Sequence, residues 1–368
     1  NRAIELIGGK KGKKGKKGGY SLIHPNAHVN MSQSTNDTMP TALRLAAFAS
    51  SGLLISALTG LKKTLRLKSK EFKDVIKSGR THLQDAVPIT LGQEFGSYAA
   101  AIRSSIEKIE LSSKRLKRIG LGGTAVGTGI NTHPRFKTIV LRELSKVCGI
   151  KGLKIAPNAF ESINSAGDFT ACSAAMRDAS IELIRITNDL RLLGSGPRTG
   201  FAEITMPAVQ PGSSIMPGKI NPAMAEMLGM VCFQVIGNDL AVTLAAQAGQ
   251  LELNVMLPLI NYNILQSSEI LTNAINVFNS RCVAGIKVDK KRCGAYFKNS
   301  IGLAAILNRF IGYENAAKAA KDAISSGKSL QEIIIEKGLL TKKELDEISS
   351  PASVTRPSNP KGAAKRRR

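Results

Sequence analysis

Long runs of apolar residues with helical spacing alternate along the chain with short polar or glycine-rich segments. The first run follows Asn36 and Asp37, which suit a helix start, and Pro40, which suits a first turn. Four long helices are predicted from these runs, at residues 40–67, 91–117, 158–193 and 222–258. The last meets no proline before Pro258, so it would form a rod of roughly 50 Å. Because strands and helices do not alternate, the pattern predicts an all-α fold, a long-helix bundle.

The helices shorten and the charge rises after residue 288, with turn signals at three glycines. We therefore predict three parts: a central helical-bundle domain at residues 1–288, a small helical C-terminal domain at 289–349, and a basic disordered tail at 350–368 rich in Ser, Pro and Lys. The run 222–258 is apolar on more than one face, which is typical of a helix buried in a bundle, often between subunits.

Composition excludes several classes of protein. With 43% hydrophobic residues the chain is able to bury a sizeable core, so wholesale disorder is excluded. Five cysteines, odd in number and without a CxxC pair, exclude a zinc ribbon and favour a reducing, cytoplasmic location. The longest near-apolar stretch, residues 46–61, is shorter than the ~20 residues of a membrane span, so no membrane segment is expected. The chain starts at Asn1, inside a helical pattern, as a fragment or a processed chain would.

Positive charge is concentrated in two blocks. The formal net charge is +25, and Lys10–Lys17, in a Lys-Gly loop at residues 10–19, and Lys365–Arg368 are almost uniformly basic. Such blocks attract nucleic acid and other polyanions nonspecifically. No aromatic residues lie between the lysines to stack on bases, which favours a solvated loop and tail. A noncatalytic nucleic-acid-binding protein stays open as an alternative.

Three polar islands interrupt the helices, at residues 24–37, 78–85 and 210–222. Helix-end loops of this kind often carry function, because their backbone N–H groups are free to bind anions. Together the islands supply hydroxyls, amides, imidazoles, one Lys and one Arg, but no metal-ligand set. We therefore expect a site for a small carboxylate substrate that uses neither a metal nor an organic cofactor.

Other motif readings fail on particular residues. His24 and His28 are four apart, but Pro25 separates them and no Glu follows, so they do not form the HExxH zinc motif. Residues 212–219 have the wrong glycine spacing for a P-loop, and Ile220 stands where Ser or Thr must hold magnesium. Residues 123–129 are glycine-rich but follow no apolar strand, unlike a dinucleotide site. Ser213 with His82 stays open as an acyl-transfer pair.

The third island carries a specific resemblance. Residues 212–222 read GSSIMPGKINP, which resembles the GSSxMPxKxNP signature of the fumarase/aspartase superfamily. SQSTND at residues 32–37 and GRTHLQD at 79–85 occur where that superfamily has its other two active-site blocks. The resemblance runs from Asn1 to about Ser349. It implies that roughly a hundred residues of the family, including a substrate-binding loop, precede the position of Asn1.

Membership of this superfamily would imply a homotetramer around about twenty long helices, with active sites built from three subunits. It would also imply a small dicarboxylate substrate and an anti elimination that releases fumarate. The stretches 188–193, 207–212, 223–226 and 249–256 are similar to the aspartase branch. The expected activity is therefore that of an aspartate ammonia-lyase, with fumarate hydratase as the alternative.

The resemblance also implies a role for individual residues. Ser213 matches the general base that removes the C3 proton of the substrate, while Lys219 and Asn221 match the groups that hold the adjacent carboxylate. The remaining matches are Ser34, Thr35, Asn36 and Thr81 as donors to the substrate, His82 as the active-site histidine, Glu226 as the carboxylate paired with it, and His24 with Asn26 as a second anion site.

Overall fold

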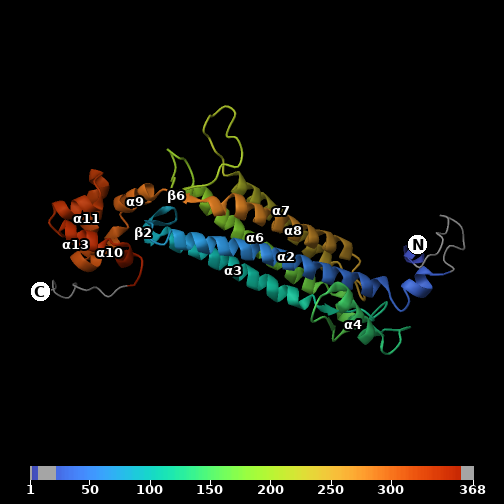
Figure 1. Ribbon diagram of the computed structural model, residues 1–368. Helices are drawn as coiled ribbons and strands as arrows, with labels where there is room; N and C mark the ends of the chain where they lie inside the picture. Colours follow the sequence, from blue (N-terminus) through green and yellow to red (C-terminus); the bar gives the residue numbers. More distant parts are fainter. Residues whose placement is uncertain (1, 7–21, 358–368) are drawn as a thin grey trace. The chain divides into compact units, whose positions relative to one another are not determined.

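The computed structural model describes residues 2–6 and 22–357 and is mostly helical, as predicted (Figure 1). The block Lys10–Lys17 and the basic end Lys365–Arg368 lie outside the described residues. The α-helices are α1 (Arg2–Leu6), α2 (Thr35–Glu71), α3 (Leu91–Arg115), α4 (Phe136–Cys148), α5 (Ala159–Asn164), α6 (Gly167–Leu193), α7 (Ala223–Gln247), α8 (Leu257–Arg281), α9 (Lys290–Asn299), α10 (Leu303–Ile311), α11 (Tyr313–Ser326), α12 (Leu330–Glu336), α13 (Lys342–Ile348) and α14 (Pro351–Val354).

Short strands and two irregular turns complete the described chain. A π-helical turn (Pro25–Val29) precedes α2, and a 3-10 turn (Val283–Gly285) follows α8. The strands pair as β1 (Ile76–Thr81) with β2 (Gln84–Thr90), β3 (Arg118–Ile119) with β4 (Lys154–Ile155), and β5 (Ile204–Thr205) with β6 (Lys287–Val288). The β3–β4 pair is parallel and the other two are antiparallel.

Two of the long helices expected from the sequence are interrupted. The predicted helix 158–193 is divided between α5 and α6, because the backbone at Ser165 is extended. The predicted rod 222–258 ends at Gln247, and a turn leads into α8. Asn254 stabilises that end: its side-chain amide donates to the carbonyls of Ala245 and Ala246 at 3.1 and 3.2 Å. The last carbonyls of a helix lack backbone partners, so this contact acts as a C-terminal cap.

The chain divides into two compact units. Unit 1 comprises Asn1–Ile55, Glu107–Ser180 and Phe233–Leu271, and unit 2 comprises Ser56–Ile106, Ile181–Cys232 and Thr272–Arg368. Each unit contains consecutive parts of the same five long helices, α2, α3, α6, α7 and α8. The boundary at residue 288 that the sequence suggested stays a prediction.

In unit 1, polar side chains join helices that pack mainly through apolar residues. The buried Asp239 of α7 accepts hydrogen bonds from Ser173 at 2.6 Å and from Arg177 at 2.9 Å, both on α6. The Asn238 amide donates to Ser267 of α8, and Ser268 donates to the carbonyl of Ser50 in α2. Buried polar groups are costly unless paired, so these contacts fix which helix faces meet.

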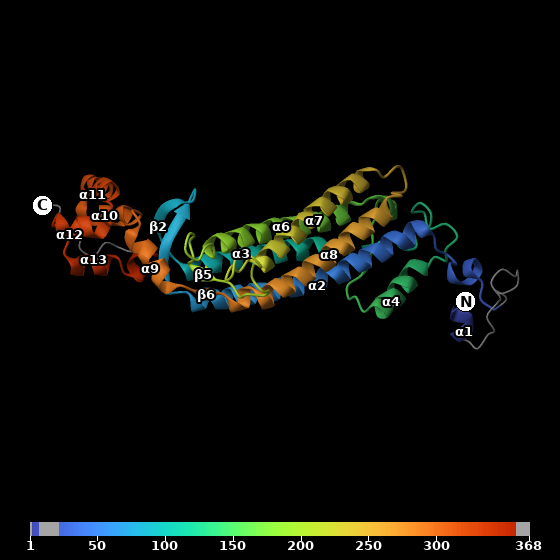
Figure 2. The same cartoon turned by 90° about the horizontal axis from the view of Figure 1, so that it is seen from above.

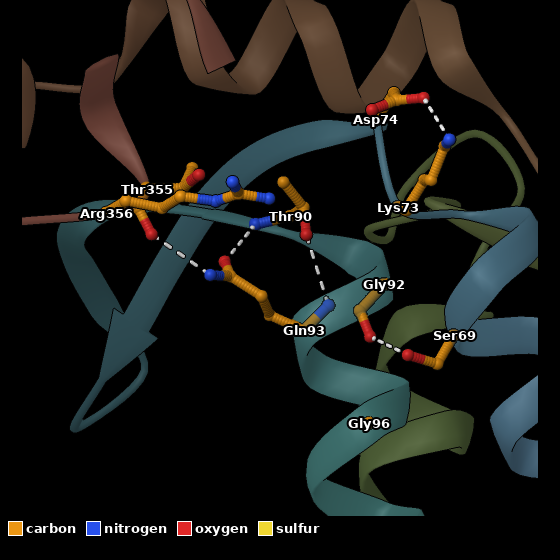
Figure 3. A pocket seen from close by; sticks show the side chains of 9 residues that line it. All are labelled: Ser69, Lys73, Asp74, Thr90, Gly92, Gln93, Gly96, Thr355 and Arg356. Atoms are coloured by element: carbon orange, nitrogen blue, oxygen red, sulfur yellow. Dashed lines mark hydrogen bonds and ion pairs between the residues drawn. The ribbon is translucent and has the colours of Figure 1, made fainter. Parts of the chain in front are cut away.

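In unit 2, the C-terminal helices form their own apolar cluster and cover the β1–β2 hairpin. Leu303, Leu307 and Ile334 lie in this cluster, with exposures of 1% or less. Helix α9 packs on β1, and α10 and α14 pack on β2 (Figures 1 and 2). Helix α14 lies within the stretch predicted to be a disordered tail; next to it the Thr355 carbonyl accepts a hydrogen bond from the Gln93 side chain at 3.0 Å (Figure 3).

By length and composition alone, α2 and α7 are each long and apolar enough to cross a membrane. Both carry buried charged groups that are paired within unit 1. Arg44 of α2 is 1% exposed and donates to Asp168, and Asp239 of α7 binds Arg177. Such paired charges are typical of the core helices of a water-exposed bundle.

Asp168 accounts for a testable part of the stability of unit 1. Its carboxylate meets Arg115 at 2.6 Å and Arg44 at 2.7 Å. Burial opposes its ionisation, but the hydrogen bonds from the two arginines outweigh burial and hold the pKa of Asp168 below its usual range.

We expect Asp168→Asn to destabilise the protein by about 3 kcal/mol at neutral pH, because Arg44 is left buried without its partner. The folded-state pKa is depressed, so the contribution of Asp168 is complete above its unfolded pKa of about 3.9 and is lost as the pH falls through the folded value. Urea unfolding of both proteins from pH 7 to pH 3 should show the difference narrowing below about pH 4. A difference independent of pH would contradict this assignment.

Candidate active site

The second island forms a β-hairpin in unit 2, which the sequence did not predict. Strand β1 ends at Thr81 and β2 begins at Gln84, so only His82 and Leu83 form the turn. These two residues have φ values of 56° and 60°, as in a type I′ turn. Positive φ is unfavourable for both residue types, and such strain concentrates at functional sites. Thr81 and His82 are exposed at the tip.

The third island is a loop closed by its own backbone. The N–H of Ser213 donates to the carbonyl of Lys219 at 3.2 Å, and the N–H of Lys219 donates to the carbonyl of Met216 at 3.1 Å. A Cβ at Gly212 would lie 2.5 Å from the Lys219 carbonyl oxygen, so only glycine permits this closure. The hydroxyl oxygen of Ser213 accepts a hydrogen bond from the N–H of Met216 at 3.3 Å.

A cavity of about 170 Å³ lies at the base of this loop. Residues Gly218–Pro222 form one wall, and residues between Gly194 and Met206 form the other. Lys219 and Asn221, the two groups expected to hold a carboxylate, thus line the same cavity. The chain then enters α7, with the N–H of Glu226 bonded to the carbonyl of Pro222. One ammonium, one amide and a helix start are groups of the kind that bind a small anion.

Glu226 has a different partner from the expected one within the described chain. It lies in the first turn of α7, where its carboxylate is 3.8 Å from the Arg191 guanidinium of α6. The sequence resemblance predicts a pairing of Glu226 with His82. The side chains of Glu226 and His82 are both substantially exposed, so the packing of unit 2 does not hold them together.

The first island lies in unit 1, where Asp37 organises it. Asp37 is fully buried, and its carboxylate accepts hydrogen bonds from the backbone N–H groups of Ser34 at 3.0 Å and of Gly122 and Thr124 at 2.9 Å. The Ser34 hydroxyl oxygen accepts from the N–H of Asn36, which completes a cap at the start of α2. The Asn36 amide donates to the carbonyl of Ala125 at 2.8 Å, and Thr35 remains exposed.

The glycine-rich stretch that follows Gly120 is therefore a partner of the first island. Gly122, Gly127 and Gly129 have positive φ, which lets the loop turn back on itself. The sequence does not predict this contact between the glycine-rich stretch and Asp37. The residue that pointed to it was the Asp at the end of SQSTND, but its burial depends on packing from distant residues.

His24 and Asn26 form a local turn ahead of α2. The Nδ1 atom of His24 accepts hydrogen bonds from the N–H groups of Asn26 and Ala27, both at 3.1 Å, and the N–H of His24 donates to Nδ1 of His28 at 2.8 Å. Both imidazoles are exposed. Among the described residues, no group of three His, Cys, Asp or Glu side chains is arranged to hold a metal ion.

The structure thus brings Lys219 and Asn221 together at one cavity, with Ser213 in the loop above, and holds Ser34, Thr35 and Asn36 together at the start of α2. Thr81, the last residue of β1, and His82, in the turn that follows, lie at the hairpin tip of unit 2, whereas Ser34 to Asn36 and His24 belong to unit 1.

The family is decided by comparison with known proteins. A family model described as "Lyase" matches residues 1–237, and one described as "Fumarase C C-terminus" matches residues 303–356. The chain belongs to the fumarase/aspartase family. This membership confirms the resemblance carried by the GSSIMPGKINP loop, and the C-terminal match covers helices α10–α14.

Individual members of the fumarase/aspartase family are similar over nearly the whole chain. An aspartate ammonia-lyase from a Bacillus species is 46% identical over 97% of this chain and 75% of its own length, and one from Helicobacter pylori strain 26695 is 45% identical over the same shares. A crystal structure of fumarate lyase:delta crystallin from Brucella melitensis superimposes with a TM-score of 0.92 at 47% identity, covering 97% of this chain and 76% of that one. The class II fumarase of Schistosoma mansoni gives a TM-score of 0.87 at 37% identity, covering 97% and 77%.

Proposed function

We propose that this chain is an aspartate ammonia-lyase, which eliminates ammonia from L-aspartate to give fumarate. The observation that carries the proposal is that Lys219 and Asn221 both line one cavity, next to the loop that is closed between Ser213 and Lys219. The similarity to aspartate ammonia-lyases at 42–46% identity supports this substrate. The similarity to a fumarase at 37% identity keeps fumarate hydratase as the alternative.

In the proposed reaction, Ser213 removes a proton from C3 of aspartate, next to the β-carboxylate. The electron pair left on C3 is delocalised into that carboxylate, and it forms the C=C bond as the C–N bond breaks and ammonia leaves. A C–H next to a carboxylate is very weakly acidic, so catalysis requires stabilisation of charge that exists only in the transition state. The ammonium of Lys219 and the amide of Asn221 supply fixed donors for it.

The remaining candidate residues would bind and orient the substrate. We assign Ser34, Thr35, Asn36 and Thr81 to donors for its two carboxylates, His82 with Glu226 to proton handling at the site, and His24 with Asn26 to a second anion site. Neither a metal nor an organic cofactor enters this scheme.

We further propose that the chain works as a homotetramer in the cytoplasm, with active sites completed by residues of more than one copy. Phe233, Leu240 and Leu244 on α7 are more than half exposed, which suits a face covered by another copy. All five cysteines are free, as a reducing compartment favours.

A second candidate function, polyanion binding, is favoured by a groove in unit 2. Lys62, Arg66 and Lys70 lie four residues apart on α2, so they follow one another at about 6 Å along the helix. With Arg103 of α3 they line a groove of about 380 Å³ that contains no carboxylate. Ser69 and Gly96 connect this groove to a neighbouring cavity of about 300 Å³, where Lys73 and Arg356 add further cations and Asp74 pairs with Lys73 (Figure 3). The blocks Lys10–Lys17 and Lys365–Arg368 would add to the same binding.

The proposed reaction predicts a clear substrate preference. With L-aspartate, the purified chain in its assembled state should produce fumarate, measured as a rise in ultraviolet absorbance, whereas L-malate should produce none. Turnover of malate alone would replace the proposal with fumarate hydratase.

If Ser213 is the general base, its replacement should abolish turnover but change the affinity for aspartate little. Ser213→Ala should abolish deamination and leave aspartate binding within about threefold, because Lys219 and Asn221 still hold the carboxylate. Lys219→Ala should lower the rate by at least 10²–10³-fold and also weaken binding. Calorimetric titration with aspartate would measure the two affinities. Stoichiometric labelling of Ser213 by a fluorophosphonate would contradict the base assignment and identify an acyl nucleophile instead.

The groove predicts salt-dependent binding of a polyanion. Replacing Lys62, Arg66 and Lys70 by Gln should weaken binding of a labelled single-stranded DNA and reduce the slope of log K against log salt by about two. A matched variant with Lys290, Lys291 and Lys342 changed to Gln carries the same net charge and should retain most of the slope. Equal effects of the two variants would mean that net charge, and not the groove, binds DNA.

A further inference from the structure

Strand β1, which ends at Thr81 next to His82, contains an irregularity that turns the Arg80 side chain to the other face. Strand β1 shifts register against β2 between Ser78 and Arg80, which is the pattern of a β-bulge. Alternation along a regular strand would put Lys77 and Arg80 on opposite faces. Here both reach the same carboxylate. The bulge depends on Gly79, because a Cβ at that position would lie 2.5 Å from the carbonyl oxygen of Val87.

The shared carboxylate is Glu203, which is fully buried. Its oxygens lie 2.7 Å from the ammonium of Lys77 and 2.9 Å from the guanidinium of Arg80, at ion-pair distance but without hydrogen-bond alignment. Lys77 also contacts Glu94 of α3 at 2.8 Å, so two acids and two bases alternate. Arg80 lies over the ring of Phe201 at 4.2 Å and over that of Tyr296 at 5.4 Å, which fixes the plane of its guanidinium.

The backbone of Glu203 is held at both ends. Its N–H donates to the carbonyl of Leu193 at the end of α6, and its carbonyl accepts from the N–H of Asp289 at the start of α9, both at 2.9 Å. Its neighbours Ala202 and Ile204 line the cavity that contains Lys219 and Asn221. One rigid residue therefore lies between the cavity wall and the strand that ends in Thr81 and His82.

We propose that Glu203 is a positioning residue, which acts through Arg80 to hold Thr81 and His82, at the hairpin tip, in a fixed place within unit 2. This inference rests on the proposed lyase function. A buried ion pair by itself is a poor source of stability, because desolvation offsets most of its attraction. Its contribution here is geometric: Arg80 directly precedes the turn, so the direction of its side chain sets the direction of the hairpin tip. Small displacements of catalytic groups lower rates strongly.

The test compares Glu203→Gln with two further variants of the full chain. Glu203→Gln keeps the shape of the side chain and removes its charge, and it should lower kcat/KM for aspartate at least tenfold. Glu203→Asp keeps the charge and should recover part of that loss. Arg80→Lys keeps the ion pair but loses the stacking between the rings, and it should lower kcat/KM by less than Glu203→Gln. It supplies the test by comparison with the wild type if Glu203→Gln does not fold, and an unchanged kcat/KM in Arg80→Lys would then contradict the inference.

A double variant separates positioning from general damage to the fold. If Glu203 acts through the turn, Glu203→Gln should lower the rate little further once His82 is replaced by Ala. If the double variant instead loses kcat/KM by the product of the two single losses, the inference is overturned. Asp168→Asn is the matched control, because it also removes a buried carboxylate between two bases; it should leave kcat/KM within about twofold.

A measurement without turnover keeps the inference separate from the proposed function. The chain has four histidines, so the imidazole C2–H signal of His82 is identifiable by nuclear magnetic resonance through its loss in His82→Ala. Glu203→Gln and Arg80→Lys should shift or broaden that signal and leave those of His24, His28 and His133 in place. An unchanged His82 signal would overturn the inference. Wild-type protein that does not convert aspartate, with a His82 signal that still responds to Glu203→Gln, would overturn the lyase function alone.

Discussion

Water solvates an ionised carboxylate so strongly that burying one costs several kcal/mol unless cations and hydrogen-bond donors replace the lost water. Asp37, Asp168 and Glu203 all meet this requirement with groups from other parts of the sequence. Asp37 uses backbone N–H groups of the Gly122–Thr124 loop, Asp168 uses Arg44 and Arg115, and Glu203 uses Lys77 and Arg80. Each carboxylate needs its donors at particular distances and angles, so its burial also fixes the positions of the segments that carry those donors. The first and second islands both lie next to such a carboxylate.

The long helices were predictable because their signals are local. Proline and glycine mark their ends, and apolar residues recur with helical spacing, so α2 and α3 were placed to within a few residues at most ends. The end of α7 at Gln247 was not predicted, because the residue that caps it, Asn254, follows a turn that contains no proline. The β1–β2 hairpin was missed for a different reason. Its turn residues, His82 and Leu83, are not those that favour positive φ, and its strands are held by α9, α10 and α14, which lie more than two hundred residues away.

For the candidate site, the sequence predicted the chemistry of the loops better than their partners. The glycines and prolines around Ser213 indicated a turn, and the structure closes it between Ser213 and Lys219. The partners of single residues were harder to predict: Glu226 lies 3.8 Å from Arg191 of α6, a contact that the sequence does not indicate, and its pairing with His82 stays a prediction. The Glu203–Arg80 contact could not be predicted from the sequence either. It depends on a bulge at Gly79, and a bulge reverses the side-chain alternation on which strand prediction relies.

The loop geometry bears on how a serine serves as a base. A serine hydroxyl is a poor proton acceptor, so its alkoxide must be stabilised before it is able to remove a proton from carbon. The N–H of Met216 donates to the Ser213 oxygen, and the same short loop returns Lys219 to the N–H of Ser213. A hydrogen bond donated to the oxygen favours its charged form. An acyl nucleophile would instead need an imidazole within hydrogen-bond reach of the hydroxyl, and His82 lies at the tip of a separate hairpin. The backbone of the signature loop therefore supports the proposed role of Ser213 in proton removal, because Gly212 permits the loop to close and brings the N–H of Met216 to the serine oxygen.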